Sequence, residues 1–231
     1  NEIIEEVPEV DAVLGTTSYG DILKAIHEAM EGKHFQEFKD IDYLPEKLGK
    51  RVLTTGGHFG YLKIAEGCDK HCTYCIIPKL RGKFRSVPME RLVTQAKEMA
   101  EEGVKELILV AQETTVYGTD IYGKKSLHIL LKELCKIKGL RWIRVLYCYP
   151  EEIYDELIQT MKEEKKICHY LDLPIQHASD RILKRMGRRT TQAELVEIVN
   201  KLRREIPDIV LRTTLISGFH GETQEDHEEL M

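Results

Sequence analysis

Short apolar runs alternate with longer amphipathic segments from residue 51 onward. The short runs have the length and the β-branched content of buried strands. In the longer segments apolar residues recur with helical spacing, as Leu92, Ala96 and Met99 do, which indicates helices buried along one face. The expected strands are 61–65, 106–111, 142–147, 170–174 and 209–216, and the expected helices are 89–102, 126–137, 151–162 and 192–205.

Repetition of strand, helix and strand predicts an α/β fold, because such units join neighbouring parallel strands by right-handed crossovers. Periodicity leaves two architectures open, a doubly wound open sheet or part of a barrel. Both place their chemistry at the carboxyl ends of the strands. Polar residues that directly follow an expected strand are therefore the first candidates for a functional site.

Acidic residues are concentrated at the start of the chain. Residues 1–50 contain 12 acidic and 5 basic side chains, whereas residues 51–231 contain 27 and 29. The first segment has one helix-like run at 20–26 and an unpatterned polar stretch at 35–50, too little for a core of its own. We expect residues 1–50 to be the end of an amino-terminal domain plus a linker. Residues 51–231 form the main domain, which we expect to continue beyond residue 231 because a helix-like segment is opening there.

Composition limits the class of protein. The chain is 42% hydrophobic and 32% charged, with a mean hydropathy of -0.34, which is typical of a globular protein. No apolar stretch is long enough for a membrane span, and the first residues are acidic where a signal peptide would be basic. We expect a cytoplasmic protein with no membrane partner.

Three of the six cysteines, Cys68, Cys72 and Cys75, lie in one loop after the first expected strand, with the spacing C-x3-C-x2-C. Three thiolates on one tight loop can bind three irons of a 4Fe-4S cluster and leave the fourth iron open to a chelating cofactor such as S-adenosylmethionine. A zinc site with His58 or His71 as fourth ligand and a redox pair of Cys72 and Cys75 are alternatives. The other cysteines lie in apolar runs and are expected to be buried thiols: Cys135, Cys148 and Cys168.

This loop, with the aromatic Tyr74 before its last cysteine, resembles the cluster loop of the radical S-adenosylmethionine enzymes, and the resemblance covers essentially residues 51–231. KIAEGC at 63–68 and CIIP at 75–78 are similar to the methylthiotransferase branch, which inserts sulfur into a C–H bond and methylates it. QETTVYG at 112–118 resembles the protein-modifying members of that branch, which act on an aspartate of ribosomal small-subunit protein twelve. The tRNA-modifying members usually have an asparagine-rich segment there.

The resemblance implies an open partial TIM-type barrel that binds a 4Fe-4S cluster at the three cysteines together with S-adenosylmethionine. A second 4Fe-4S cluster is expected only in the full-length protein, because its cysteines would precede Asn1. The implied partners are a ribosomal small-subunit protein or the ribosome, with tRNA as the alternative, and an electron donor such as flavodoxin or ferredoxin. A non-catalytic, zinc-stabilised module that binds the ribosome is the competing hypothesis.

Candidate cofactor-binding residues lie at or after the expected strand ends: Tyr74, Gln112, Gln176, Arg212, Thr214 and Gly218. Arg212 lies within an otherwise apolar run, so it needs either a ligand anion or a neighbouring carboxylate. His177 is expected to be a hydrogen-bonded turn residue. In the glycine loop that contains Gly218 the family usually has proline where this chain has His220, which leaves the loop less rigid.

Basic side chains form two clusters in the sequence. Such clusters are usually solvated faces, and in a chain of net charge -5 they also suit docking to a phosphate-rich partner such as the ribosome or tRNA. The first cluster contains Lys79, Arg81, Lys83 and Arg85, and the second contains Arg181, Lys184, Arg185, Arg188 and Arg189.

Overall fold

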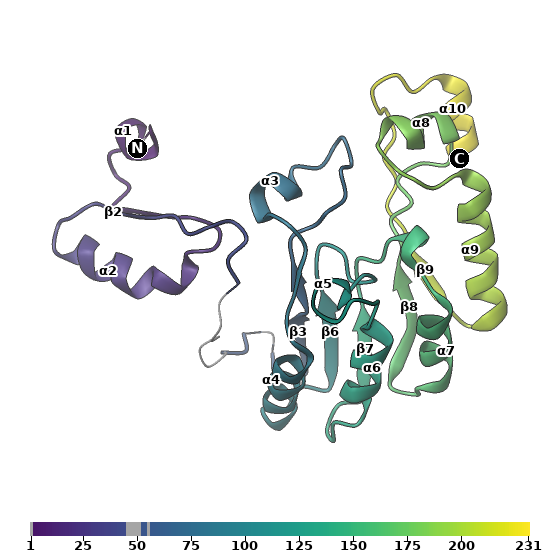
Figure 1. Ribbon diagram of the computed structural model, residues 1–231, viewed down its shortest axis with the longest axis horizontal. Coiled ribbons are helices and arrows are strands. Elements are labelled where there is room, and N and C mark those ends of the chain that lie inside the picture. Colours follow the sequence, from purple (N-terminus) through teal and green to yellow (C-terminus); the bar gives the residue numbers. More distant parts are fainter. Residues whose placement is uncertain (1, 45–51, 55) are drawn as a thin grey trace.

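The computed structural model describes residues 2–44, 52–54 and 56–231 (Figure 1). Its centre is a five-stranded sheet in the order β3 (Phe59–Lys63), β6 (Glu106–Val110), β7 (Trp142–Val145), β8 (Ile167–Asp172) and β9 (Val210–Arg212). Every neighbouring pair is parallel. The predicted α/β fold with a parallel sheet is confirmed. β3 and β9 lie at the two ends of this order, so in the described part of the chain the sheet is open rather than a closed barrel.

One face of the sheet is covered by a row of four helices, each in contact with the next. They are α4 (Met89–Glu101), α6 (Leu127–Cys135), α7 (Asp155–Glu163) and α9 (Gln192–Glu205). The side chains that alternate toward this face, such as Leu62, Leu107 and Ile143, are fully buried. The other face carries half-buried or exposed residues, among them Tyr61 and Arg144. The core therefore lies between sheet and helices, and the opposite face is left accessible.

Three of the four long helices, α4, α6 and α9, lie close to their predicted limits. Leu92, Ala96 and Met99 are buried on α4, which begins after Pro88 and is followed by Gly103 in a left-handed conformation with φ +106°. α9 begins at a capping box in which Thr191 and Glu194 satisfy each other's backbone N–H groups. Periodicity therefore predicts these helices from the sequence, and in α9 a capping box adds to it.

Several predicted elements differ from the structure. The strand expected at 170–174 is observed as β8 at 167–172, and the strand expected at 142–147 ends at Val145. The run 61–65 divides into β3 and β4 (Ala65–Glu66), because β4 leaves the main sheet to pair antiparallel with β5 (Arg85–Ser86). The run 209–216 forms a regular strand only at 210–212, because Gln176 of the facing segment adopts a left-handed φ of +70° and reduces the pairing to a single bridge with Leu215. The segment 151–162 begins as a 3-10 turn (Pro150–Glu152) before α7.

The amino-terminal segment contains α1 (Glu2–Glu6), β1 (Ala12–Leu14), a 3-10 turn (Tyr19–Asp21), α2 (Ile22–Met30) and β2 (Phe35–Glu37). β1 and β2 pair in parallel, so the stretch 35–50 begins with a strand that its polar sequence did not predict. The expected domain boundary at residue 50 lies outside the described residues. Among the described residues, no helix combines the length and the apolar character that crossing a bilayer requires.

The remaining helices are short: α3 (Ile77–Arg81), α5 (Thr119–Tyr122), α8 (Asp180–Arg185) and α10 (Gln224–Leu230). α3 follows the cysteine-containing loop, and α8 follows the loop after β8. Figure 1 shows both at the same end of the molecule, beyond the strand ends. The carboxyl ends of the parallel strands therefore carry the most irregular part of the chain, as the predicted fold requires of a functional site.

Candidate functional site

The cysteine loop, residues 67–75, begins where β4 ends and is held by the β4–β5 hairpin. Gly67 starts the loop with a φ of +77°, and a Cβ atom there would overlap the carbonyl oxygen of Lys83. Asp69 accepts a hydrogen bond from the Phe84 backbone N–H at 3.0 Å, and the Gly82 carbonyl accepts one from the Cys68 N–H at 3.2 Å. The hairpin thus positions the first cysteine through its backbone.

The second half of the cysteine loop packs against the turn after α8. The Thr73 N–H donates to the Met186 carbonyl at 3.0 Å, and the Thr73 hydroxyl donates to the Arg185 carbonyl at 3.0 Å. Gly187 has a φ of +73°, and a Cβ there would lie 2.8 Å from the His71 carbonyl oxygen. Only glycine allows this close approach, which brings Arg188 next to the cysteines.

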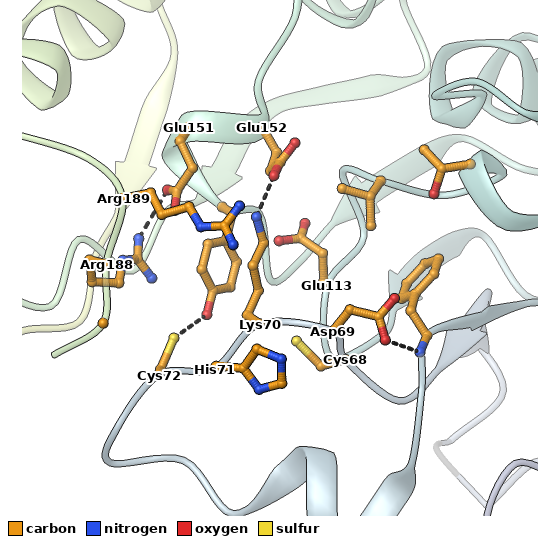
Figure 2. Close-up of a pocket in the computed structure, with 15 residues that line it drawn as sticks. Cys68, Asp69, Lys70, His71, Cys72, Glu113, Glu151, Glu152, Arg188 and Arg189 are labelled. Carbon is orange, nitrogen blue, oxygen red and sulfur yellow. Dashed lines mark hydrogen bonds and ion pairs between the residues drawn. The ribbon is translucent and has the colours of Figure 1, made fainter.

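A cavity of about 280 Å³ lies beside the cysteine loop (Figure 2). Cys68 and Cys72 line it, and both are buried. The rest of the lining comes from the same loop, from Phe84 just before β5, from the segments after β6 and β7 and from the turn after α8. Its charged residues are Asp69, Lys70, Glu113, Glu151, Glu152, Arg188 and Arg189.

Ion pairs cross this cavity. Lys70 pairs with Glu152, which also accepts from Lys125 at 2.9 Å. Burial alone raises the pKa of Glu152, but the hydrogen bonds from the two lysines outweigh it and hold the pKa below its usual range. Arg188 pairs with Glu151 at 3.2 Å while its side chain is only 1% exposed. Both carboxylates are therefore paired with basic side chains of the cavity lining or its surroundings.

Glu113 differs from these carboxylates because it forms no ion pair with any of the described residues. Its side chain is buried, and one oxygen accepts hydrogen bonds from the backbone N–H and the hydroxyl of Thr115. The other oxygen, Oε2, is buried and has no hydrogen-bond partner among the described residues. Burial raises the pKa of Glu113 to about 7, so this carboxyl can exchange a proton near neutral pH.

Tyr149 contacts Cys72 and two basic side chains of the cavity lining, Arg188 and Lys70. Its hydroxyl lies 3.0 Å from the Cys72 sulfur. The Arg188 guanidinium carbon lies 4.3 Å from the centre of the tyrosine ring, and the Lys70 ammonium lies 5.0 Å from it. Two cations thus contact one ring whose hydroxyl meets a thiol. Burial raises the pKa of Tyr149 well above its usual value, so the hydroxyl keeps its proton.

The three predicted metal ligands lie on one loop, but their thiols do not all face the same cavity. Cys68 and Cys72 line the cavity, whereas Cys75 is exposed and lies outside the lining. No group of three His, Cys, Asp or Glu side chains in the described ranges is gathered closely enough to hold a metal ion. The alternative zinc site with His58 or His71 is accordingly not assembled in this arrangement either. Burial also raises the pKa of Cys68 to about 11, so binding of a metal must release its proton.

The predicted cofactor-binding residues lie outside the cavity lining. Gln112 and Gln176, which follow β6 and β8, each have a buried amide oxygen without a hydrogen-bond partner among the described residues. Tyr74 is partly exposed and packs edge-to-face on Phe219, with 6.5 Å between ring centres. Thr214 and Gly218 are exposed. Each of these residues lies at the carboxyl end of the sheet.

Arg212 forms an ion pair with a neighbouring carboxylate, one of the two partners expected from its position in an apolar run. Its Nη1 donates to Asp172 at 2.8 Å, across the last register pair of β8 and β9. The arginine side chain is 58% exposed, whereas Asp172 is buried. His177 is a buried, hydrogen-bonded turn residue as predicted, and its Nδ1 accepts from the Ser179 N–H at 3.0 Å.

Sequence reasoning missed Glu113, Tyr149 and the role of Arg188. Glu113 and Tyr149 come shortly after β6 and β7, so the strand-end rule that selected Gln112 would have found them. The sequence places Arg188 in a basic cluster that suits docking to a phosphate-rich partner or a solvated face, but its side chain is buried. In the same cluster Arg181 is paired with Asp226, and in the first cluster Arg85 is paired with Asp42 at 3.1 Å.

The open parallel sheet and the three-cysteine loop at its carboxyl end are the features expected of a radical S-adenosylmethionine enzyme. The family model of the radical SAM superfamily matches residues 62–231, and the chain therefore belongs to this superfamily. Its fold is also that of two solved structures. One is the radical S-adenosylmethionine methyltransferase TsrM from Kitasatospora setae, with a TM-score of 0.61, 19% identity and coverage of 75% of this chain and 33% of that one. The other is the cobalamin-dependent S-adenosylmethionine radical enzyme OxsB, with a TM-score of 0.58, 15% identity and coverage of 74% and 25%.

Curated relatives are much more similar in sequence. The chain is 67% identical over 229 residues to the ribosomal protein uS12 methylthiotransferase RimO of Lachnoclostridium phytofermentans, covering 99% of this chain and 52% of that protein. It is 54% identical over 233 residues to RimO of Clostridium botulinum, covering 100% and 52%. The chain thus spans about half the length of the curated relatives it matches.

Proposed function

We propose that this chain is the radical-generating part of a methylthiotransferase that modifies ribosomal protein uS12. The observation that carries the proposal is its 67% identity to a RimO protein over nearly its whole length. The resemblance of QETTVYG at 112–118 to the protein-modifying members supports the same substrate over tRNA. A non-catalytic zinc module is not favoured, because the matching relatives are named as enzymes.

Cys68, Cys72 and Cys75 would hold a 4Fe-4S cluster. The chemistry of the donor set fits it, since thiolates are the ligands of such clusters and three of them lie within one short loop. When bound, the cluster supplies the electron that cleaves S-adenosylmethionine to a 5'-deoxyadenosyl radical.

The residues around the cluster loop have separate tasks in this proposal. Gln112 and Gln176 bind polar groups of S-adenosylmethionine, since each has a buried amide oxygen at a strand end that no described residue hydrogen-bonds. The other predicted residues contribute cofactor contacts from the exposed side of the same edge: Tyr74, Arg212, Thr214 and Gly218. Glu113 is buried in the cavity lining and has a pKa of about 7, so it can accept or return a proton.

The partners of the protein follow from this reaction. Its substrate is ribosomal protein uS12, alone or on the ribosome, which places the enzyme in the cytoplasm. A low-potential protein such as flavodoxin or ferredoxin supplies the electron. Residues 1–50 belong to a neighbouring amino-terminal domain and its linker, and residues 51–231 to the radical SAM domain.

Mass spectrometry of uS12 tests the proposal. A protein of the relatives' full length that contains this chain is reconstituted with iron and sulfide without oxygen, and is incubated with S-adenosylmethionine, a reductant and either uS12 or tRNA. We expect a methylthio group on uS12 and none on tRNA, and no product from the Cys72→Ala variant. A methylthio group on tRNA with unmodified uS12 would contradict the proposed substrate.

A further inference from the structure

Tyr149 offers the cysteine loop a hydrogen bond whose direction is fixed once Cys72 binds a metal. The tyrosine hydroxyl lies 3.0 Å from the Cys72 sulfur, and in a neutral thiol either atom could donate. A thiolate has no proton, so as a cluster ligand Cys72 can only accept. The Tyr149 hydroxyl then becomes the donor of a charge-assisted hydrogen bond.

The tyrosine is held in place from several sides. Its backbone N–H donates to the Thr115 hydroxyl at 3.1 Å, and the next residue, Pro150, begins a 3-10 turn. On its ring lie the guanidinium of Arg188 and the ammonium of Lys70. In Figure 2 the dashed line that ends at the Cys72 sulfur marks the hydrogen bond with the Tyr149 hydroxyl. The contact therefore belongs to a fixed arrangement and not to a freely rotating surface side chain.

Arg188 adds positive charge where the hydrogen bond is made. Its side chain is 1% exposed, and one terminal nitrogen is used by Glu151 at 3.2 Å. Nε and Nη1 are buried without a hydrogen-bond partner among the described residues. A buried guanidinium with two unused donors makes its surroundings favourable for additional negative charge.

We propose that Tyr149, backed by Arg188, raises the reduction potential of the cluster bound by the cysteine loop. Uptake of one electron makes the cluster and its thiolate ligands more negative, and a hydrogen bond to a ligand sulfur stabilises that state. The electron comes from an external low-potential one-electron donor, and no proton is transferred. Tyr149 is thus a positioning residue that acts through Cys72. The inference depends on the proposed function, because it requires that the cluster binds.

The test is the reduction potential of the cluster in the reconstituted chain and its Tyr149→Phe variant, read from the EPR signal of the reduced cluster. Tyr154→Phe is the matched control. The Tyr154 hydroxyl is also hydrogen-bonded, 3.1 Å from His128 Nδ1, and its ring lies 5.4 Å from the Lys125 ammonium, but it does not contact a cysteine of the loop. We expect the equilibrium constant for reduction to fall about tenfold in Tyr149→Phe, a shift of about 59 mV to lower potential, and to stay unchanged in Tyr154→Phe.

A chain carrying 3,5-difluorotyrosine at position 149 provides a second variant of nearly the same shape. Its more acidic hydroxyl is a stronger donor, so the potential should rise above that of the unmodified chain. A full iron load with unchanged potentials in both position-149 variants would overturn the inference while leaving the proposed function intact. Loss of the cluster from Tyr149→Phe with no shift in the fluorinated chain would reduce Tyr149 to a structural role. Absence of iron from the unmodified chain would overturn the proposed function and the inference together.

Discussion

Two arginine–carboxylate pairs lie at the carboxyl end of the sheet, and their burial is opposite. Arg188, in the turn after α8, is buried against Glu151 beside the cysteine loop, whereas Arg212, at the end of β9, is exposed and reaches over the buried Asp172. The sequence pattern singled out Arg212, because a cation within an apolar run is conspicuous. The comparison teaches that the surroundings of the arginine, and not its position in a strand, decide how far its ion pair is shielded from solvent.

The cysteines also divide into those beside the cavity and those elsewhere in the fold, and replacing one beside the cavity gives the largest expected effect, on iron binding. Cys72→Ala should abolish binding of iron at the loop, because two thiolates do not hold a 4Fe-4S cluster firmly. Cys168→Ala removes a half-buried thiol on β8 and should leave the iron content unchanged. Iron and sulfide analysis after anaerobic reconstitution checks both variants. A full iron load in Cys72→Ala would mean that the loop does not provide the ligands.

Removal of each arginine measures the difference between the two pairs. Arg188→Ala leaves Glu151 without its partner in a closed site, and we expect it to lower the free energy of unfolding by about 3–5 kcal/mol. Arg212→Ala removes a largely exposed partner and should cost about 1 kcal/mol or less. Urea unfolding of the two variants gives the comparison. Equal losses would show that burial of the guanidinium does not distinguish the pairs.

Glu113 should make stability depend on pH in the direction opposite to most carboxylates. Its folded-state pKa of about 7 lies above the unfolded value of 4.5, so its contribution is complete below pH 4.5 and is lost as the pH rises through 7. The loss amounts to about 3 kcal/mol at 1.36 kcal/mol per pKa unit. Unfolding measured at pH 5 and pH 8 should show a smaller decrease in Glu113→Gln than in the unmodified chain.

Glu152 provides the control of opposite sign. Its pKa is lowered in the folded state, so its contribution is present above the unfolded pKa and is lost in acid. Glu152→Gln should therefore remove stability at pH 8 and have little effect in acid. A Glu113→Gln profile parallel to that of the unmodified chain would refute the shifted Glu113 carboxyl.

Two glycines should show the smallest difference in the free energy of unfolding when each is replaced by alanine. Gly67 and Gly218 have nearly the same left-handed φ, +77° and +78°, so alanine is strained equally at both. At Gly67 the added Cβ overlaps the Lys83 carbonyl, whereas at Gly218 nothing lies within 4 Å. We expect Gly67→Ala to cost about 2 kcal/mol more than Gly218→Ala in urea unfolding, because overpacking adds to the strain. Equal costs would show that the hairpin yields without penalty.

The sequence predicted those parts of the fold that depend on periodicity. The α9 limits follow from its apolar spacing and the Thr191 capping box, and the parallel sheet follows from the repeated order of elements. The end of β9 was not predictable, because it depends on the left-handed Gln176 of a different segment. Burial of Arg188 likewise depends on Gly187 approaching the His71 carbonyl, a contact between distant segments that no local pattern encodes.

For the site, the sequence identified the cysteine loop by its spacing and the sheet edge by its topology. It did not show which charged residues close the cavity, since Lys70, Glu152 and Lys125 come from three separate segments. Nor did it show the contact between Tyr149 and Cys72, which are 77 positions apart. Contacts between side chains that meet only after the sheet has formed cannot be predicted from the local sequence.

Cleavage of S-adenosylmethionine by the anaerobically reconstituted chain is the most direct test of the central claim that the cysteine loop generates a radical. We expect a brown protein with about four irons at the loop that releases 5'-deoxyadenosine when dithionite is added, and no release from Cys72→Ala. A colourless protein that binds zinc through the same cysteines and leaves S-adenosylmethionine intact would contradict the account.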